Sequence, residues 1–95
     1  MVKVDKLAVV HENADIGDNC VIGPFCTIGP NTQIGPNTTL RSHVVVEPYT
    51  TIGADCDIFP FVTLGIQSQE HKQVQETVTY TEIGSRQNIL QSVLL

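Results

Sequence analysis

A six-residue repeat runs through most of this sequence and limits the possible folds more than any other feature. Stepping by six from Val4 to Leu64 meets only Val, Ile or Leu. The positions are Val4, Val10, Ile16, Ile22, Ile28, Ile34, Leu40, Val46, Ile52, Ile58 and Leu64. The repeat then breaks and resumes at Ile83, Ile89 and Leu95. We expect these side chains to point inward and to stack on their equivalents in the next layer.

The residues between the aliphatic positions predict a turn in each repeat. All seven glycines directly follow a repeat aliphatic, and all five prolines come two residues after one. Asn or Asp comes three residues after one at Asn13, Asn19, Asn31, Asn37 and Asp55. Proline fixes φ near −65° and Asn or Asp tolerates φ > 0, so these pairs favour tight turns. A turn every six residues, with this density of proline, excludes an α-helix.

The position four residues after each aliphatic holds a small or medium side chain, which we expect to face inward where a corner leaves little room. These residues are Ala8, Ala14, Cys20, Cys26, Thr32, Thr38, Val44, Thr50, Cys56 and Val62. Three repeats would close one triangular coil of eighteen residues. The sequence therefore predicts an all-β parallel β-helix, in one small domain over residues 1–95.

One insertion interrupts the predicted β-helix. The next aliphatic residue is due at position 70 and comes at Ile83, so a loop is expected over about residues 66–82. The loop is polar, and loops carried on a rigid scaffold are where function concentrates. The alternative is that this loop is exposed to solvent and has no function.

Composition excludes several classes of function. The net charge is −5 with only five Lys and Arg residues, which argues against nucleic-acid binding and against a polybasic membrane patch. The sequence has no membrane-spanning apolar run and no signal-peptide pattern, so we expect a cytoplasmic protein. It also lacks Cys-x-x-Cys and His-x-x-x-His spacings, and neither a metal nor a cofactor is predicted.

The cysteine, histidine and aspartate residues of the sequence do not form a recognisable catalytic arrangement. Cys20, Cys26 and Cys56 occupy the small inward position and are expected to pack as inert thiols. His11, His43 and His71 fall in different phases of the repeat and form no cluster. Asp55 and Asp57 flank a corner and are expected to be solvated.

Phe25, His43 and Phe61 lie eighteen residues apart, so one exposed edge should carry all three. They could be an aromatic ladder that covers a turn. They could equally be a subunit contact, because aligned exposed aromatic residues tend to mark interfaces.

Three segments resemble the UDP-N-acetylglucosamine O-acyltransferases that begin lipid A synthesis, which belong to the hexapeptide-repeat acyltransferases. They are residues 22–26 (Ile-Gly-Pro-Phe-Cys), 40–46 (Leu-Arg-Ser-His-Val-Val-Val) and 58–65 (Ile-Phe-Pro-Phe-Val-Thr-Leu-Gly). The placement of the insertion agrees as well. The resemblance spans nearly all of this chain but would cover only about the first third of a family member.

The resemblance implies a fold, an activity and partners. The fold is a left-handed parallel β-helix that assembles as a homotrimer. The activity is transfer of a 3-hydroxyacyl chain from acyl carrier protein to the 3-hydroxyl of UDP-N-acetylglucosamine. The family's insertion carries a Gln-Asp-x-Lys pattern that contacts substrate. Gln69 and Lys72 match this pattern and Glu70 replaces the Asp, so these three are the candidate substrate-binding residues.

Two departures from the family pattern keep alternatives open. After the insertion the family usually has Ile-Gly-Asp-x-Asn-x-Ile-Arg-Glu. Residues 83–91 keep the Ile and Gly of this pattern but change several polar positions, and Ser85 stands in place of the Asp. The catalytic His of the family lies in later coils, and none of His11, His43 or His71 matches it. No catalytic residue is therefore assigned, and we expect these 95 residues alone to lack activity. The alternatives are a non-catalytic scaffold or trimerisation module and an acyltransferase of another hexapeptide branch.

Overall fold

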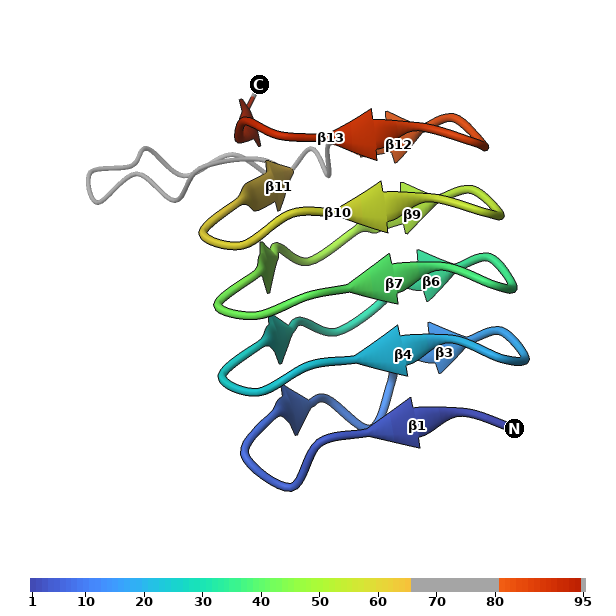
Figure 1. Cartoon of the computed structure of the whole chain (residues 1–95), viewed down its shortest axis with the longest axis vertical. Helices are drawn as coiled ribbons and strands as arrows, with labels where there is room; N and C mark the ends of the chain where they lie inside the picture. The colour runs from blue at the N-terminus through green and yellow to red at the C-terminus, as the bar shows by residue number, and fades with distance from the viewer. Residues whose placement is uncertain (66–80, 95) are drawn as a thin grey trace, which may run out of the picture.

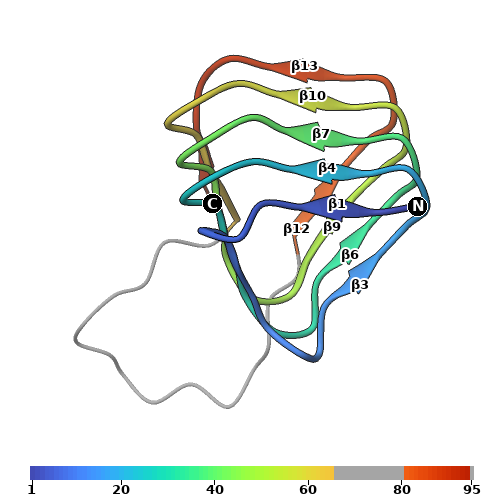
Figure 2. The ribbon, with the colours of Figure 1, turned by 60° about the horizontal axis from the view of Figure 1, so that its bottom comes forward.

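The computed structural model describes residues 1–65 and 81–94, which form a left-handed parallel β-helix (Figure 1). Its short strands fall into three sheets that enclose the core as a triangular prism (Figure 2). The first sheet contains β1 (Lys3–Val4), β4 (Val21–Ile22), β7 (Thr39–Leu40), β10 (Asp57–Ile58) and β13 (Asn88–Ile89). The second contains β2 (Val9–Val10), β5 (Thr27–Ile28), β8 (Val45–Val46), β11 (Thr63–Gly65) and β14 (Val93–Leu94). The third contains β3 (Asp15–Ile16), β6 (Gln33–Ile34), β9 (Thr50–Ile52) and β12 (Thr81–Ile83).

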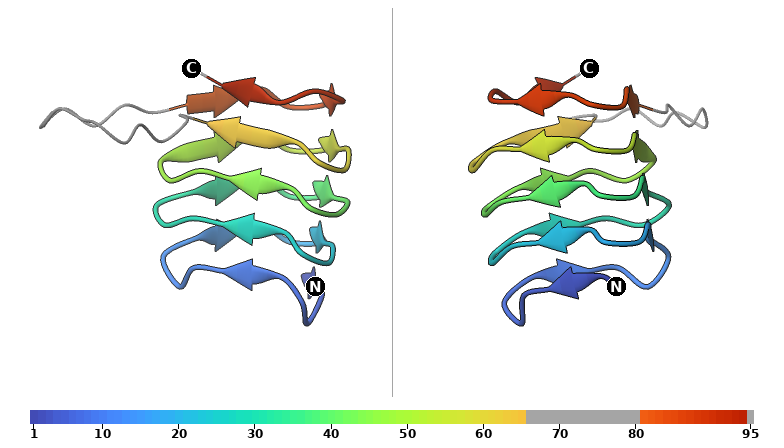
Figure 3. Two further views of the ribbon diagram at one scale, coloured as in Figure 1. Left: turned by 90° about the vertical axis from the view of Figure 1, so that its left-hand side faces the viewer. Right: turned by 45° about the vertical axis from the view of Figure 1, so that its right-hand side comes forward.

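Every strand pairs in parallel with its equivalent in the next coil, as the eighteen-residue period predicts. Ile22 is opposite Leu40, and Leu40 is opposite Ile58. Backbone N–H groups donate from one coil to carbonyls of the next, as from Gly23 N to Leu40 O at 2.8 Å. The coils therefore stack along the long axis of the molecule (Figure 3).

The core consists of the predicted inward residues. The repeat aliphatics from Ile22 to Leu64 are at most 3% exposed, and the small inward positions from Cys20 to Val62 are also buried. All three cysteines are free and buried, as expected. Val4 is 47% exposed, because no coil covers it from below.

The corners use the left-handed backbone conformation three residues after each aliphatic from Ile16 to Ile58, and again after Ile83. Asn19, Asn31, Asn37 and Asp55 have positive φ, as predicted. Five residues of other types share this conformation: Phe25, His43, Tyr49, Phe61 and Arg86. Asn13 is the exception to the prediction, because its N–H donates to His11 Nδ1 and holds a different turn.

Two boundaries differ from the sequence prediction. Thr81 and Glu82, placed in the loop by the repeat, belong to β12 and pair with Thr50 and Thr51. The repeat also puts Leu95 opposite Leu64, whereas β14 places Val93 there. The last corner lacks the Gly-Pro turn and is shorter, and Ser92 Oγ accepts a hydrogen bond from Thr63 N at 2.8 Å.

Candidate functional site: the corner at the insertion

The insertion leaves and rejoins the β-helix at one corner. The described chain ends with β11 of the second sheet at Gly65 and resumes with β12 of the third sheet at Thr81. We call the edge between these two sheets the second corner. The corner between the first and second sheets is the first corner, and that between the third and first is the third corner. Of the described residues, those at the second corner and on the third sheet therefore lie nearest the start and end of the insertion.

Gly65 marks the point where the insertion leaves the β-helix. Its φ is +118°, a conformation that side chains rarely adopt, and it lies at the end of β11. A Cβ at this position would lie 2.5 Å from Thr50 Oγ1 and 2.8 Å from Glu47 Cβ. Only glycine fits this exit without displacing the coil beneath it.

A column of buried threonines forms the inner wall of the second corner. Thr32, Thr50 and Thr81 are 1%, 0% and 3% exposed. Thr32 Oγ1 donates to Gly29 O at 3.0 Å. Within the described chain, Thr50 Oγ1 and Thr81 Oγ1 have no hydrogen-bond partner. The two unpaired hydroxyls are therefore stacked where the insertion rejoins the β-helix.

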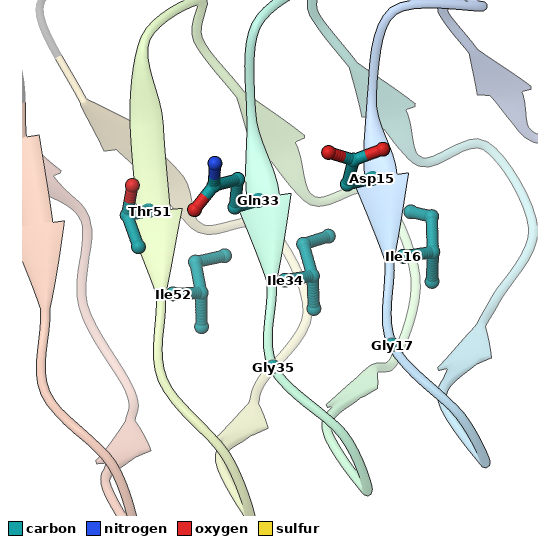
Figure 4. Close-up of a pocket in the computed structure, with 8 residues that line it drawn as sticks. All are labelled: Asp15, Ile16, Gly17, Gln33, Ile34, Gly35, Thr51 and Ile52. Carbon is teal, nitrogen blue, oxygen red and sulfur yellow. The ribbon is translucent and has the colours of Figure 1, made fainter.

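The outer surface beside this corner carries a row of uncharged and acidic polar groups. Asp15, Gln33, Thr51 and Glu82 are in register on β3, β6, β9 and β12. The first three line a hollow of about 420 Å³, and Ile16, Ile34 and Ile52, the next residues along the three strands, are also among its lining residues (Figure 4). A second hollow of about 280 Å³ joins this row to the corner, and its lining includes Asn13, Asn31 and Tyr49.

These side chains offer amide, hydroxyl and carboxylate groups at the regular spacing of parallel strands, about 4.8 Å. Such groups suit a ligand that is rich in hydroxyl and amide groups, such as a sugar. No Lys or Arg lines either hollow among residues 1–65 and 81–94. A phosphate bound here would need its positive charge from elsewhere.

The three substrate-binding residues predicted from the sequence, Gln69, Glu70 and Lys72, lie outside the described residues. Their role stays a prediction, as does the place of His71. Among the described residues, His11 is the one histidine at the second corner. Its Nδ1 accepts the Asn13 N–H at 3.0 Å, so it acts as a turn cap.

The predicted aromatic stripe is confirmed at the first corner. The His43 ring is stacked between Phe25 and Phe61, with ring centroids 5.0 and 4.7 Å apart. Phe25 is 53% and Phe61 74% exposed. Each of the three residues has a positive φ, which costs a non-glycine residue roughly 1–2 kcal/mol. We call these three residues the aromatic ridge.

One polar contact was missed by the sequence analysis, and it corrects the expectation that Asp57 is simply solvated. Arg41 Nε donates to Asp57 Oδ1 at 2.9 Å, and Arg41 Nη2 donates to Asp57 Oδ2 at 2.7 Å. The guanidinium carbon also lies 3.9 Å from the centre of the Phe59 ring. The hydrogen bonds from Arg41 hold the pKa of the Asp57 carboxyl below its usual value.

The buried thiols show a different electrostatic effect. Burial raises the pKa of the Cys26 thiol, because the thiolate would lose its hydration. Cys26 Sγ donates to Leu40 O at 3.9 Å, and Cys20 Sγ donates to Gly35 O at 3.0 Å. These contacts fit a packing role for both cysteines.

Comparison with known proteins agrees with this architecture. The family model for the bacterial transferase hexapeptide (six repeats) matches residues 1–30 and 25–59. The chain therefore belongs to the bacterial transferase hexapeptide family. A search of curated proteins finds no match.

Two solved structures are similar to this chain, and both are acyltransferases. UDP-N-acetylglucosamine acyltransferase from Francisella novicida is 35% identical over 99% of this chain, with a TM-score of 0.85. UDP-N-acetylglucosamine O-acyltransferase from Moraxella catarrhalis RH4 is 37% identical over 96% of this chain, with a TM-score of 0.84. The chain spans 34% and 36% of the length of these two proteins. The resemblance inferred from the sequence is thus confirmed, and it links the chain to acyltransferases of this family.

A membrane-spanning helix was not found in the described part of the chain, where no helix has the length and apolar character to cross a bilayer.

Proposed function

We propose that this chain is part of a UDP-N-acetylglucosamine O-acyltransferase of lipid A synthesis. The observation that carries the proposal is the identity of 35% and 37% with two such enzymes over nearly the whole chain. The acyl donor would be 3-hydroxyacyl-acyl carrier protein, and the acceptor would be the 3-hydroxyl of UDP-N-acetylglucosamine. The working form would be a homotrimer in the cytoplasm.

The reaction is transfer of an acyl group from a thioester to an alcohol. The sugar oxygen attacks the thioester carbonyl, the C–S bond breaks, and an ester forms. The hydroxyl proton passes to a general base, and the thiol of acyl carrier protein leaves with a proton. By resemblance the base is a His in coils that follow residue 95, so these 95 residues would supply substrate contacts without the base.

The insertion supplies the charged contacts in this proposal. Lys72 would donate to a phosphate oxygen of the nucleotide, and such charge-assisted hydrogen bonds are stronger than neutral ones. Such a positive charge is missing from the described residues that line the hollows of the third sheet. Gln69 and Glu70 would offer an amide and a carboxylate to polar groups of the substrate. The polar row from Asp15 to Glu82 would lie beside the bound sugar.

Binding of UDP-N-acetylglucosamine to the 95-residue chain tests the proposal directly. We expect weak binding in isothermal titration calorimetry, and we expect Lys72→Ala to weaken it at least tenfold. Lys72→Arg keeps the positive charge and should retain most of the affinity. Equal affinity of the wild type and Lys72→Ala, or no binding by either, would count against the proposal. Acyl transfer by the 95-residue chain is expected to be absent.

A non-catalytic scaffold is the second candidate, and one contact favours it. Ser85 stands where the family pattern has Asp, and its Oγ accepts a hydrogen bond from Ala54 N at 3.0 Å. This polar position therefore stabilises the corner between two coils. Stable association without affinity for UDP-N-acetylglucosamine would favour the scaffold.

A further inference from the structure

The polar row on the third sheet is longer than one sugar ring. Its residues lie in successive coils at about 4.8 Å per coil, so they span about 14 Å. They are Asp15, Gln33, Thr51 and Glu82. The insertion rejoins the β-helix at the Glu82 end, where Thr81 N donates to Tyr49 O at 3.0 Å. The sugar of the proposed function would lie near that end, which leaves the Asp15 end without a role.

The Asp15 end of the row borders the second of the two hollows, which we call the corner hollow. Its volume is about 280 Å³, and its lining among the described residues consists of Asn13, Asp15, Asn31, Thr32, Gln33 and Tyr49. Backbone hydrogen bonds fix these residues relative to one another. Asn31 N donates to Asn13 O at 3.1 Å, and Tyr49 N donates to Pro30 O at 3.2 Å. The corner hollow is therefore held in place by the stacking of the coils.

The side chains of the corner hollow have hydrogen-bonding capacity that the fold does not use. Within residues 1–65 and 81–94, the side chains of Asn13, Asp15, Asn31 and Gln33 make no hydrogen bond or ion pair. On the first sheet, by contrast, the outward carboxylate of Asp57 accepts two hydrogen bonds from the guanidinium group two strands' length away in sequence. Three carboxamides and one carboxylate in the hollow are thus available to donate to a ligand and to accept from it.

The chemistry of the lining defines the class of ligand. Among the described residues, neither Lys nor Arg lines the corner hollow, and Asp15 contributes a negative charge. A phosphate or carboxylate would therefore meet a like charge without a compensating cation. A metal ion is also disfavoured, because no three His, Cys, Asp or Glu residues in the described part of the chain are grouped to hold one. A neutral ligand whose hydroxyl groups both donate and accept hydrogen bonds matches the lining best.

We propose that the corner hollow is a binding site for a neutral saccharide, separate from the site proposed for the sugar nucleotide. Sugar hydroxyls would donate to the Asp15 carboxylate, and such charge-assisted hydrogen bonds are the stronger ones. The carboxamides of Asn31 and Gln33 would donate to neighbouring hydroxyls and accept from them. The partly buried Tyr49 ring would border an apolar face of the sugar. The proposal uses no residue of the insertion and does not depend on the proposed function.

Titration of the ¹⁵N-labelled 95-residue chain with cellobiose, a neutral disaccharide, tests the site by NMR. We expect saturable shifts at the amides of Asn13, Asn31 and Gln33, with a dissociation constant on the order of 1 mM. Asn31→Gly and Gln33→Ala should each raise this constant at least fivefold, and the spectra show whether each variant is folded. Asn37→Gly is the matched control, because Asn37 has the same positive φ outside the hollow and glycine adopts it readily. It should bind cellobiose as the wild type does.

Three results would overturn the proposal. The first is the absence of saturable shifts up to about 20 mM cellobiose, well above the expected constant. The second is an unchanged dissociation constant in both Asn31→Gly and Gln33→Ala. The third is binding of spermidine or of cellobiose 6-phosphate at the same amides as tightly as cellobiose, which would contradict selection of a neutral ligand. Lys72→Ala should keep the wild-type affinity for cellobiose, so its loss of sugar-nucleotide binding would bear on the proposed function alone.

Discussion

At the scale of single residues, Gly23 is the most tightly enclosed of the glycines in the β-helix. A Cβ at residue 23 would lie 1.5 Å from Arg41 O, an overlap with the backbone of the next coil. Gly23 N also donates to Leu40 O at 2.8 Å, so the strand cannot shift without breaking the ladder. The glycine is thus required by close approach of two backbones.

We expect Gly23→Ala to lower the free energy of unfolding by at least the roughly 1–3 kcal/mol typical of overpacking. Gly84→Ala is the matched control, since the nearest atom to its Cβ would be Gln87 Nε2 at 3.9 Å. Urea denaturation followed by circular dichroism measures both. Equal midpoints for the two variants would contradict the enclosed position of Gly23.

The ion pair between Arg41 and Asp57 predicts a dependence of stability on pH. The pKa of Asp57 is lowered in the folded state by the hydrogen bonds from Arg41. Its stabilising contribution is therefore fully present above the unfolded-state pKa, and it is lost as the pH falls through the lower folded-state value. Because both side chains are partly exposed, at 45% and 34%, added salt should reduce the effect.

Asp57→Asn should remove this part of the pH dependence. We expect its melting temperature to fall less between pH 5 and pH 2 than that of the wild type, over the range in which carboxyl groups titrate, around pH 4. Asp55→Asn, which removes a carboxylate outside the ion pair, should keep the wild-type slope. Parallel curves for the wild type and Asp57→Asn would show that the pair adds nothing to stability.

At the scale of the structural element, buried threonines at two corners differ in their hydrogen bonding, with Thr38 at the third corner and Thr50 at the second. Thr38 Oγ1 donates to Gly53 O at 2.9 Å and accepts from Cys56 N at 3.2 Å. Thr50 Oγ1 has no such partner among the described residues. A buried hydroxyl that lacks a hydrogen bond destabilises the fold, and an apolar group of the same shape does not.

Thr50→Val and Thr81→Val should therefore leave stability unchanged or raise it. Thr38→Val should lower the free energy of unfolding by about 1 kcal/mol or more, because it also leaves the Cys56 N–H without an acceptor. Chemical denaturation of the three variants compares them directly. A loss at Thr50 as large as that at Thr38 would reveal a hydrogen-bond partner for Thr50 in solution.

The β-helix could be predicted because the six-residue pattern that produces it involves only residues close together in the sequence. An aliphatic residue every six positions dictates which side chain is buried, and Pro-Asn pairs such as Pro30-Asn31 dictate the turn. The eighteen-residue coil then brings Phe25, His43 and Phe61 together without further information. Each of these inferences needs only the period of the repeat.

The contacts that escaped prediction depend on side-chain direction or on broken phase. Arg41 follows β7 directly and pairs with Asp57 on β10 of the next coil, and the repeat does not specify the direction of either side chain. Val93 replaces Leu95 opposite Leu64 because Leu90, Gln91 and Ser92 lack the residues of a regular corner. The candidate substrate-binding residues belong to the insertion, where the repeat gives no rule at all.

At the scale of the whole molecule, each coil is stabilised mainly by the coils next to it, as in other solenoids. Leu40 lies between two coils and is fully buried, whereas Val4 has a neighbour on one side only and is 47% exposed. Stability is therefore concentrated in the central coils. The first coil is the place where unfolding should begin.

Leu40→Ala should lower the free energy of unfolding by about 2–5 kcal/mol, the usual range for a buried Leu. Val4→Ala should cost much less and should mainly increase hydrogen exchange in the first coil. Native-state hydrogen exchange of both variants separates the local effect from the global one. Uniform loss of protection in Val4→Ala would show that the coils unfold as a single unit.

The residues on either side of the insertion reproduce an ordinary corner of the same chain. Gly65 is followed, after the insertion, by Thr81, Glu82 and Ile83, just as Gly29 is followed, after Pro30-Asn31, by Thr32, Gln33 and Ile34. Thr81 pairs with Thr50 as though the chain had not been interrupted. Replacing residues 66–80 with Pro-Asn should therefore restore a seamless repeat. The β-helix can therefore be engineered separately from the insertion, which is the part that we propose contacts substrate.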